Sequence, residues 1–232
     1  MLLLRTKEVL AKGRLMELTT MVTMLASGFL VSLQIFFLTL CGALPLGIVM
    51  ALLRMSKFKP IAALARIYIS IMRGTPLMLQ LMFVYFVPYY GFGISLSTEW
   101  KMGAAVVAFI MNYTAYFAEI YRSGIQSIPQ GQYEAAAVLG YTRTQTFFKI
   151  VLPQVIKRIV PAMGNEIIVL VKDTSLAFTI GVLEMFTVAR SIVSSQGTLL
   201  AFVIAAVFYW VFTFILEGVF SFIEKRLDYY HD

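Results

Sequence analysis

The chain has 232 residues, of which 60% are hydrophobic and 13% charged, and its formal net charge is +7. Soluble proteins carry about 25% charged residues, so the composition excludes an ordinary water-soluble domain. In a soluble protein the positive charge would indicate nucleic-acid binding. Here the Lys and Arg residues gather between apolar stretches, which favours orientation in a lipid bilayer and no nucleic-acid partner.

The apolar runs predict five membrane-spanning helices. Four runs contain no Asp, Glu, Lys or Arg: residues 18–53, 74–98, 102–118 and 191–216. A further run, residues 153–183, is equally apolar but carries five charged residues. The first run is too short for two helices and a turn, so we count one span that ends near Arg54. Residues 1–17 are expected to form a basic amphipathic segment without a cleavable signal peptide, and residues 227–232 a C-terminal tail.

Basic residues indicate the orientation of these spans. With five spans, three basic clusters fall on one side of the membrane: Arg54, Lys57 and Lys59; Arg122, Arg143, Lys149, Lys157 and Arg158; Lys225 and Arg226. The positive-inside rule makes this side cytoplasmic. The opposite side carries Lys101 and Arg190, and also the basic N-terminus, which conflicts with the rule.

The region between the third and fourth spans, about residues 124–154, is too long for a simple connection. Residues 127–130 resemble a helix start, residues 133–139 are Ala-rich, and Gly140 is suited to end the helix. A second short helix is predicted over residues 143–151. Two short helices joined at a glycine would form a compact knob on the cytoplasmic surface, which another protein could grip.

Within this region, residues 128–140 read IPQGQYEAAAVLG and residues 150–153 read IVLP. This sequence resembles the EAA loop of ATP-binding-cassette (ABC) importer permeases. Three further motifs narrow the resemblance to polar amino-acid permeases: RGTPL at 73–77, AYFAEIYR at 115–122 and KDTSL at 172–176. The resemblance extends over roughly residues 20–225. The alternative is an ordinary Ala-rich surface helix in which Glu134 is a solvated charge.

This resemblance implies an all-α integral membrane protein of about five transmembrane helices, with the type I ABC importer permease fold and cytoplasmic coupling helices over residues 18–226. It implies a non-catalytic permease subunit in the bacterial cytoplasmic (inner) membrane, which passes a polar amino acid by alternating access. The expected partners are an ABC ATPase dimer that uses ATP and Mg²⁺, a second or homologous permease, and an extracytoplasmic substrate-binding protein. The implied ATPase-coupling residues are Glu134, Ala135, Ala136 and Gly140.

Polar residues within the spans point to a transport pathway without reference to the family. If the second helix enters the membrane near Pro60 and the fourth near Pro153, Arg73 and Glu166 each lie about 20 Å along the helix axis. Asn112 in the third span reaches a similar depth from the other face. Charges at mid-membrane depth are costly and should face protein or water.

A free amino acid carries one carboxylate and one ammonium group. The guanidinium of Arg73 is suited to bind the carboxylate, while Glu166 or Asn112 receives the ammonium. Thr75 lies in a predicted helix break that would leave backbone groups free to line a cavity. The family resemblance implies substrate sites at positions matching Arg73, Asn112 and Glu166, and Glu166 favours a cationic or neutral substrate. The alternative is that Arg73 and Glu166 pair structurally with each other.

Other polar residues and absences complete the prediction. Glu119 and Arg122 predict a structural ion pair, and Asp173 shares a helix face with Glu166. The sequence lacks a phosphate-binding loop, and it contains a single His and a single Cys. We therefore expect no ATP, cofactor or metal bound by this chain. An ion-coupled secondary transporter, a channel subunit, or a permease for another small polar solute remain as alternatives.

Overall fold

The computed structural model describes the backbone of residues 2–227 and the side chains of residues 18–227. Its first helix, α1 (Leu2–Arg54), is continuous, and its apolar part, Leu18–Arg54, is long enough to cross a membrane. This confirms the prediction of one span in the first apolar run. The amphipathic character expected of residues 1–17 concerns side chains that lie outside the described part of the chain, as do the final residues of the tail.

The second predicted span is a bent pair of helices. The predicted break at Thr75 is present, and it divides the expected single span from Pro60 into two separate helices. Helix α2 (Lys59–Gly74) and helix α3 (Leu77–Phe92) meet at an angle of 111°. Pro76 has no amide hydrogen and restricts the residue before it to extended conformations, and Thr75 adopts φ −119° and ψ 147°. The chain therefore cannot continue α2 through this point.

The third predicted span is confirmed as helix α4 (Trp100–Gln126), which lies at the centre of the bundle. Its inner face carries small and aromatic residues, and Phe109, Tyr113 and Phe117 are almost completely buried. Near its end Gly124 allows close contact with the fourth span, since a Cβ there would lie 2.2 Å from Cγ2 of Ile159. Helix α4 packs against α1, α2, α3 and the fourth span.

The fourth span is helix α7 (Leu152–Asp173), which the 3₁₀ helix η2 (Thr174–Ile180) extends. The fifth predicted run, residues 191–216, is wrong as a single helix. It includes the end of α8 (Met185–Gln196) and most of α9 (Leu200–Leu227). Gly197 separates the two helices in a left-handed conformation, with φ 65°. Counting charges missed this stop because the residues around it are uncharged.

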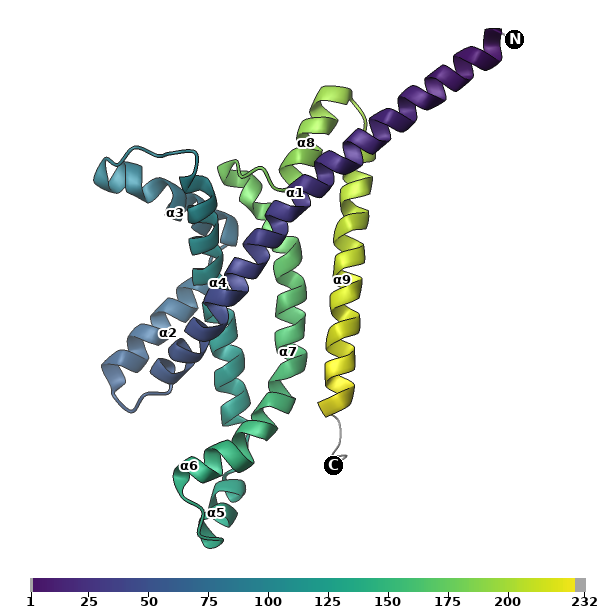
Figure 1. Ribbon diagram of the computed structural model, residues 1–232. Coiled ribbons are helices and arrows are strands. Elements are labelled where there is room, and N and C mark those ends of the chain that lie inside the picture. Colours follow the sequence, from purple (N-terminus) through teal and green to yellow (C-terminus); the bar gives the residue numbers. More distant parts are fainter. Residues whose placement is uncertain (1, 228–232) are drawn as a thin grey trace.

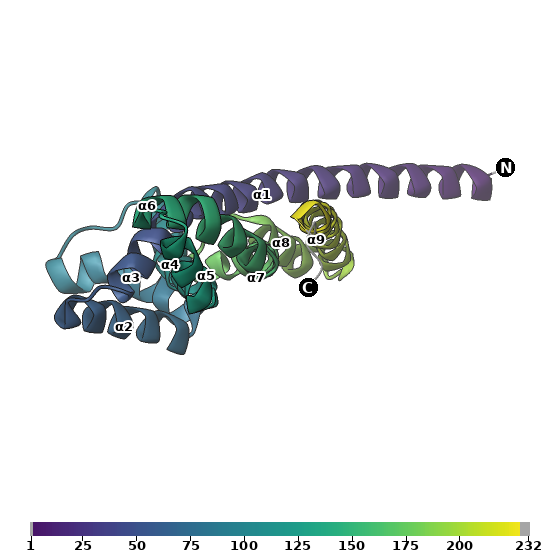
Figure 2. The ribbon, with the colours of Figure 1, turned by 90° about the horizontal axis from the view of Figure 1, so that it is seen from below.

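The described helices comprise three that are long and apolar enough to span a membrane, or up to five when each bent pair counts as one span. Figure 1 shows α4 and α7 at the centre of the molecule, with α9 beside α7 and α1 crossing them obliquely. The short helices α5 (Gln130–Val138) and α6 (Arg143–Thr146) project at the end where α9 also finishes. Figure 2 looks onto this end. The three basic clusters therefore share one end of the molecule, as the sequence predicted.

Candidate functional site

The break between α2 and α3 leaves carbonyl groups at the end of α2 without helical partners. Gln80, one turn into α3, fills this gap. Its Nε2 lies 2.9 Å from Met72 O, 3.1 Å from Thr75 O and 2.8 Å from Thr75 Oγ1. The Thr75 hydroxyl itself donates to Ile71 O at 2.8 Å. The hydroxyl of Thr75, a predicted substrate ligand, is therefore engaged in closing the helix break, although the residue is exposed.

Asn112 approaches the same break from α4 and is buried. Its Nδ2 donates to Met72 O at 3.1 Å and to Gln80 Oε1 at 3.0 Å. Both amide hydrogens are thus used by the protein, and the acceptor Oδ1 is the part of Asn112 that could serve a ligand. Sequence reasoning missed Gln80, although it is the one Gln in the uncharged run 74–98 and could have been recognised by that isolation.

Arg73 and Glu166 lie within electrostatic range of each other without forming a direct salt bridge. Among the described residues, the one direct salt bridge joins Glu119 and Arg122, with a distance of 2.6 Å. Arg73 is exposed, and its guanidinium carbon lies 5.3 Å from the centre of the Tyr116 ring, which holds it by a cation–π contact. Glu166 on α7 is half-buried and close enough to Arg73 for their charges to attract each other. Both charged groups therefore keep bonding capacity for a ligand.

A second polar contact continues from Glu166 along the same helix. Tyr113 on α4 is 2% exposed, and its hydroxyl donates to Asp173 Oδ2 at 2.8 Å. Asp173 ends α7 and lies within electrostatic range of Glu166. The two carboxylates thus lie on one face of α7, as their spacing predicted. Tyr113 ties the outer part of this polar strip to the central helix.

The first knob helix and its end at Gly140 agree with the prediction, whereas the predicted second short helix is the start of a longer helix that continues into α7. Helix α5 ends in a motif in which Gly140 N donates to Ala137 O and Tyr141 N donates to Ala136 O, both at 3.0 Å. Gly140 has φ 80°, a left-handed conformation that favours glycine. Helix α6 begins with a capping box in which the Thr142 and Gln145 side chains bond each other's backbone amides. It passes without interruption through the π-helical turn η1 (Phe147–Val151) into α7.

The turn of the knob exposes two large apolar side chains. Val138 is 88% exposed and Leu139 is 73% exposed, at the turn between α5 and α6. Of the predicted coupling residues, Glu134, Ala135 and Gly140 are exposed, while Ala136 is 1% exposed and faces inward. A compact projection that presents two large aliphatic side chains has the form of a docking surface.

The base of the knob is fixed to the bundle by a residue that sequence reasoning did not single out. Arg158 on α7 donates through Nη1 to the backbone oxygen and the hydroxyl of Ser127, which follows α4. Arg122 of α4 binds Glu119 and Gln126 on the same helix, which confirms the predicted structural ion pair. The ends of α4 and α7 are thus joined where the knob begins and finishes.

No group of His, Cys, Asp or Glu side chains within the described residues is arranged to hold a metal ion. The polar residues instead form a strip of one guanidinium, two carboxylates and two amides beside the bend of α2 and α3. Such a strip offers opposite charges to a small zwitterion.

Comparisons with known proteins agree with this architecture. Residues 43–229 match the family model described as binding-protein-dependent transport system inner membrane component. The chain is 38% identical over 208 residues to the L-cystine transport system permease protein TcyB of Bacillus subtilis, covering 89% of this chain and 87% of the relative. It is 37% identical to the arginine transport system permease protein ArtQ of the same organism, covering 86% and 90%.

A solved structure is also similar. A chain in the crystal structure of an amino acid ABC transporter with histidines superimposes with a TM-score of 0.82 at 34% identity, covering 91% of this chain and 97% of that one. The arrangement of helices, knob and bends is therefore similar to that of a solved ABC transporter chain.

Proposed function

The chain belongs to the family of binding-protein-dependent transport system inner membrane components, and we propose that it is the permease subunit of an ABC importer for a polar amino acid. It lies in the bacterial cytoplasmic membrane as a multi-pass protein of the type I importer permease fold. The observation that carries the proposal is the combination of a knob at one end, which exposes Val138 and Leu139, with the opposite charges of Arg73 and Glu166, which form no salt bridge.

The proposed ligand follows from what the similar permeases have in common. TcyB is named for L-cystine and ArtQ for arginine, whose side chains differ but whose α-amino and α-carboxyl groups are the same. Arg73 would bind the carboxylate, and Glu166 with Oδ1 of Asn112 would receive the ammonium. Thr75 and Gln80 would hold the bend that places Arg73. The strip is thus suited to the shared zwitterion, and we do not assign the side chain of the substrate.

The energy source would be a separate ATPase dimer, since this chain has no phosphate-binding loop. ATP and Mg²⁺ would bind to that partner. Glu134, Ala135 and Gly140, together with the exposed Val138 and Leu139, would form the surface that docks in the ATPase. A second permease copy or a homologous permease would complete the pathway, and an extracytoplasmic binding protein would deliver the substrate.

The position of the knob suggests how closure of the ATPases reaches the substrate. The knob is inserted between the two helices that carry Asn112 and Glu166. Asn112 lies 14 residues before the end of α4 and Glu166 lies 14 residues after the start of α7, or about 21 Å from the knob in each case. A rigid displacement of the knob would therefore shift both ligand-binding groups together, which is what alternating access requires.

Uptake of labelled amino acids into proteoliposomes that contain the chain, its ATPase and its binding protein tests the proposal. We expect Glu166→Gln and Arg73→Ala to lower uptake at least tenfold while the complex still assembles. Glu217→Gln, which neutralises an exposed carboxylate on α9, is the matched control and should leave uptake unchanged. Uptake that proceeds without ATP would identify a secondary transporter or channel instead. Normal uptake by both strip variants would assign the charges a structural role.

A further inference from the structure

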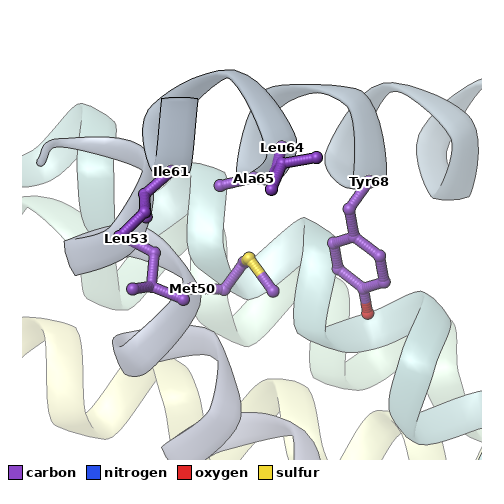
Figure 3. Close-up of a pocket in the computed structure, with 6 residues that line it drawn as sticks. All are labelled: Met50, Leu53, Ile61, Leu64, Ala65 and Tyr68. Carbon is purple, nitrogen blue, oxygen red and sulfur yellow. The ribbon is translucent and has the colours of Figure 1, made fainter. Parts of the chain in front are cut away.

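A groove lies between the end of α1 and residues 61–68 of α2 (Figure 3). Its volume is about 300 Å³, at the lower end of the range for small-molecule sites. Six side chains line it: Met50, Leu53, Ile61, Leu64, Ala65 and Tyr68. Leu64 is 68% exposed at its edge, so the groove opens outward.

The lining offers almost nothing to a polar ligand. Tyr68 supplies the one polar side-chain atom, and its hydroxyl donates to Met111 O at 2.6 Å, so it is already occupied. A ligand that placed hydrogen-bonding groups here would leave them unpaired, which is unfavourable in an apolar site. The occupant of the groove must therefore be a hydrocarbon.

The groove ends at a group of basic residues that have no acidic partner. Arg54 follows the lining residue Leu53, and Lys57 and Lys59 precede Ile61. Between residues 18 and 98 the sequence contains no Asp or Glu, and none of the three cations forms a salt bridge among the described residues. The Nε of Arg54 is buried and has no hydrogen-bond partner. The basic end of α9 differs, since Glu224 neighbours Lys225 and Arg226 there.

We propose that this groove binds an acyl chain of an anionic phospholipid from the cytoplasmic leaflet, with its phosphate group between Arg54 and Lys57. The juxtaposition of a hydrocarbon groove with unpaired cations matches a molecule that is apolar along one part and negatively charged at its end. The turn that carries Lys57 is ordered, because Ser56 Oγ accepts a hydrogen bond from Phe58 N at 3.2 Å. The bound lipid would bridge α1 and α2, and this role is independent of the transported substrate.

Native mass spectrometry of the purified complex, titrated with phosphatidylglycerol or with phosphatidylcholine of the same chains, measures the binding. We expect phosphatidylglycerol to bind more tightly. Each cation near a headgroup contributes about fivefold in affinity, so Arg54→Gln with Lys57→Gln should weaken binding about 25-fold. Arg66→Gln removes one cation on the opposite side of α2 and should have little effect, whereas Arg54→Gln or Lys57→Gln alone should each weaken binding about fivefold. Equal binding of both lipids, or unchanged binding by the double variant, would overturn the proposal.

A photo-cross-linking amino acid in place of Leu64 identifies what fills the groove in the membrane. A lipid adduct is the expected product. An adduct with a second permease chain would show that the groove is a protein interface and would overturn the lipid assignment. The exposed position of Leu64 makes the substitution compatible with folding, and Ile61→Trp offers a second variant that fills the groove and should reduce lipid retention.

Discussion

Replacing Gln80 by leucine should loosen the bend between α2 and α3. The substitution removes the donors that serve the free oxygens of Met72 and Thr75, and the acceptor for Asn112 Nδ2. Asn112 is 4% exposed, so water cannot readily replace the lost partner. At about 1 kcal/mol for each net hydrogen bond, and somewhat less between membrane helices, the loss amounts to about 2–3 kcal/mol of unfolding free energy.

Denaturant-induced unfolding of the purified chain in detergent measures this loss. Trp100 is a suitable fluorescence probe, because its Nε1 donates to Tyr85 O at 3.2 Å and so reports on the packing of α3 against α4. Gln154→Leu is the matched control, since Gln154 makes one bond to Ile150 O at 2.8 Å one turn earlier along the chain. If Gln80→Leu is no more destabilising than Gln154→Leu, the amide network does not hold the bend. Uptake should fall with stability, because Arg73 directly follows Met72.

Three further variants address the knob and its base. Leu139→Asp should change unfolding free energy by less than about 0.5 kcal/mol, because the side chain is 73% exposed. It should weaken co-purification of the ATPase about tenfold or more, as expected for a docking residue. Arg158→Gln should preserve assembly but lower uptake per ATP hydrolysed, because it weakens the connection of α7 to Ser127; an unchanged ratio would exclude a coupling role. Gly124→Ala should destabilise the fold by about 1–3 kcal/mol in thermal unfolding, because its Cβ would overlap Ile159.

Much of the fold was predictable because the bilayer thickness sets the length of a spanning helix, and because charged residues are rare within such a helix. The spans of α1 and α4, the first knob helix and the stop at Gly140 agree with the structure. The helix break at Thr75 was predicted, but the angle of 111° between α2 and α3 was not. Apolar runs show that a segment lies in the membrane, but they do not show its direction within it. The turn at Gly197 was missed because the sequence around it is uncharged, so the positions of charges mark no boundary there.

The sequence predicted the charged residues of the candidate site, but it predicted only one of the two amide residues, Asn112, and missed Gln80. Arg73 and Glu166 stand out because an ionised side chain within a membrane is energetically costly and is therefore a functional candidate. Gln80 has no charge, and its role depends on which carbonyl groups the bend leaves unpaired. That information is absent until the fold is known. Arg158 was likewise visible only as one of several basic residues that indicate orientation, and its contact with Ser127 emerges from the packing of α7 beside α4.

The same amide network links the bend to substrate binding in the proposed function. Both amide hydrogens of Asn112 are donated to Met72 O and Gln80 Oε1. Toward a ligand, the side chain can therefore only accept a hydrogen bond, through Oδ1. Glu166 also only accepts when ionised, whereas Arg73 only donates. The strip therefore presents acceptors from α4 and α7 and a donor from α2. An amino acid fits one way round, with its carboxylate toward α2. Because α4 and α7 both lead to the knob and α2 does not, ATP-driven displacement of the knob would move the acceptors relative to the donor. Release of the substrate would then follow from separating the groups that bind its two ends.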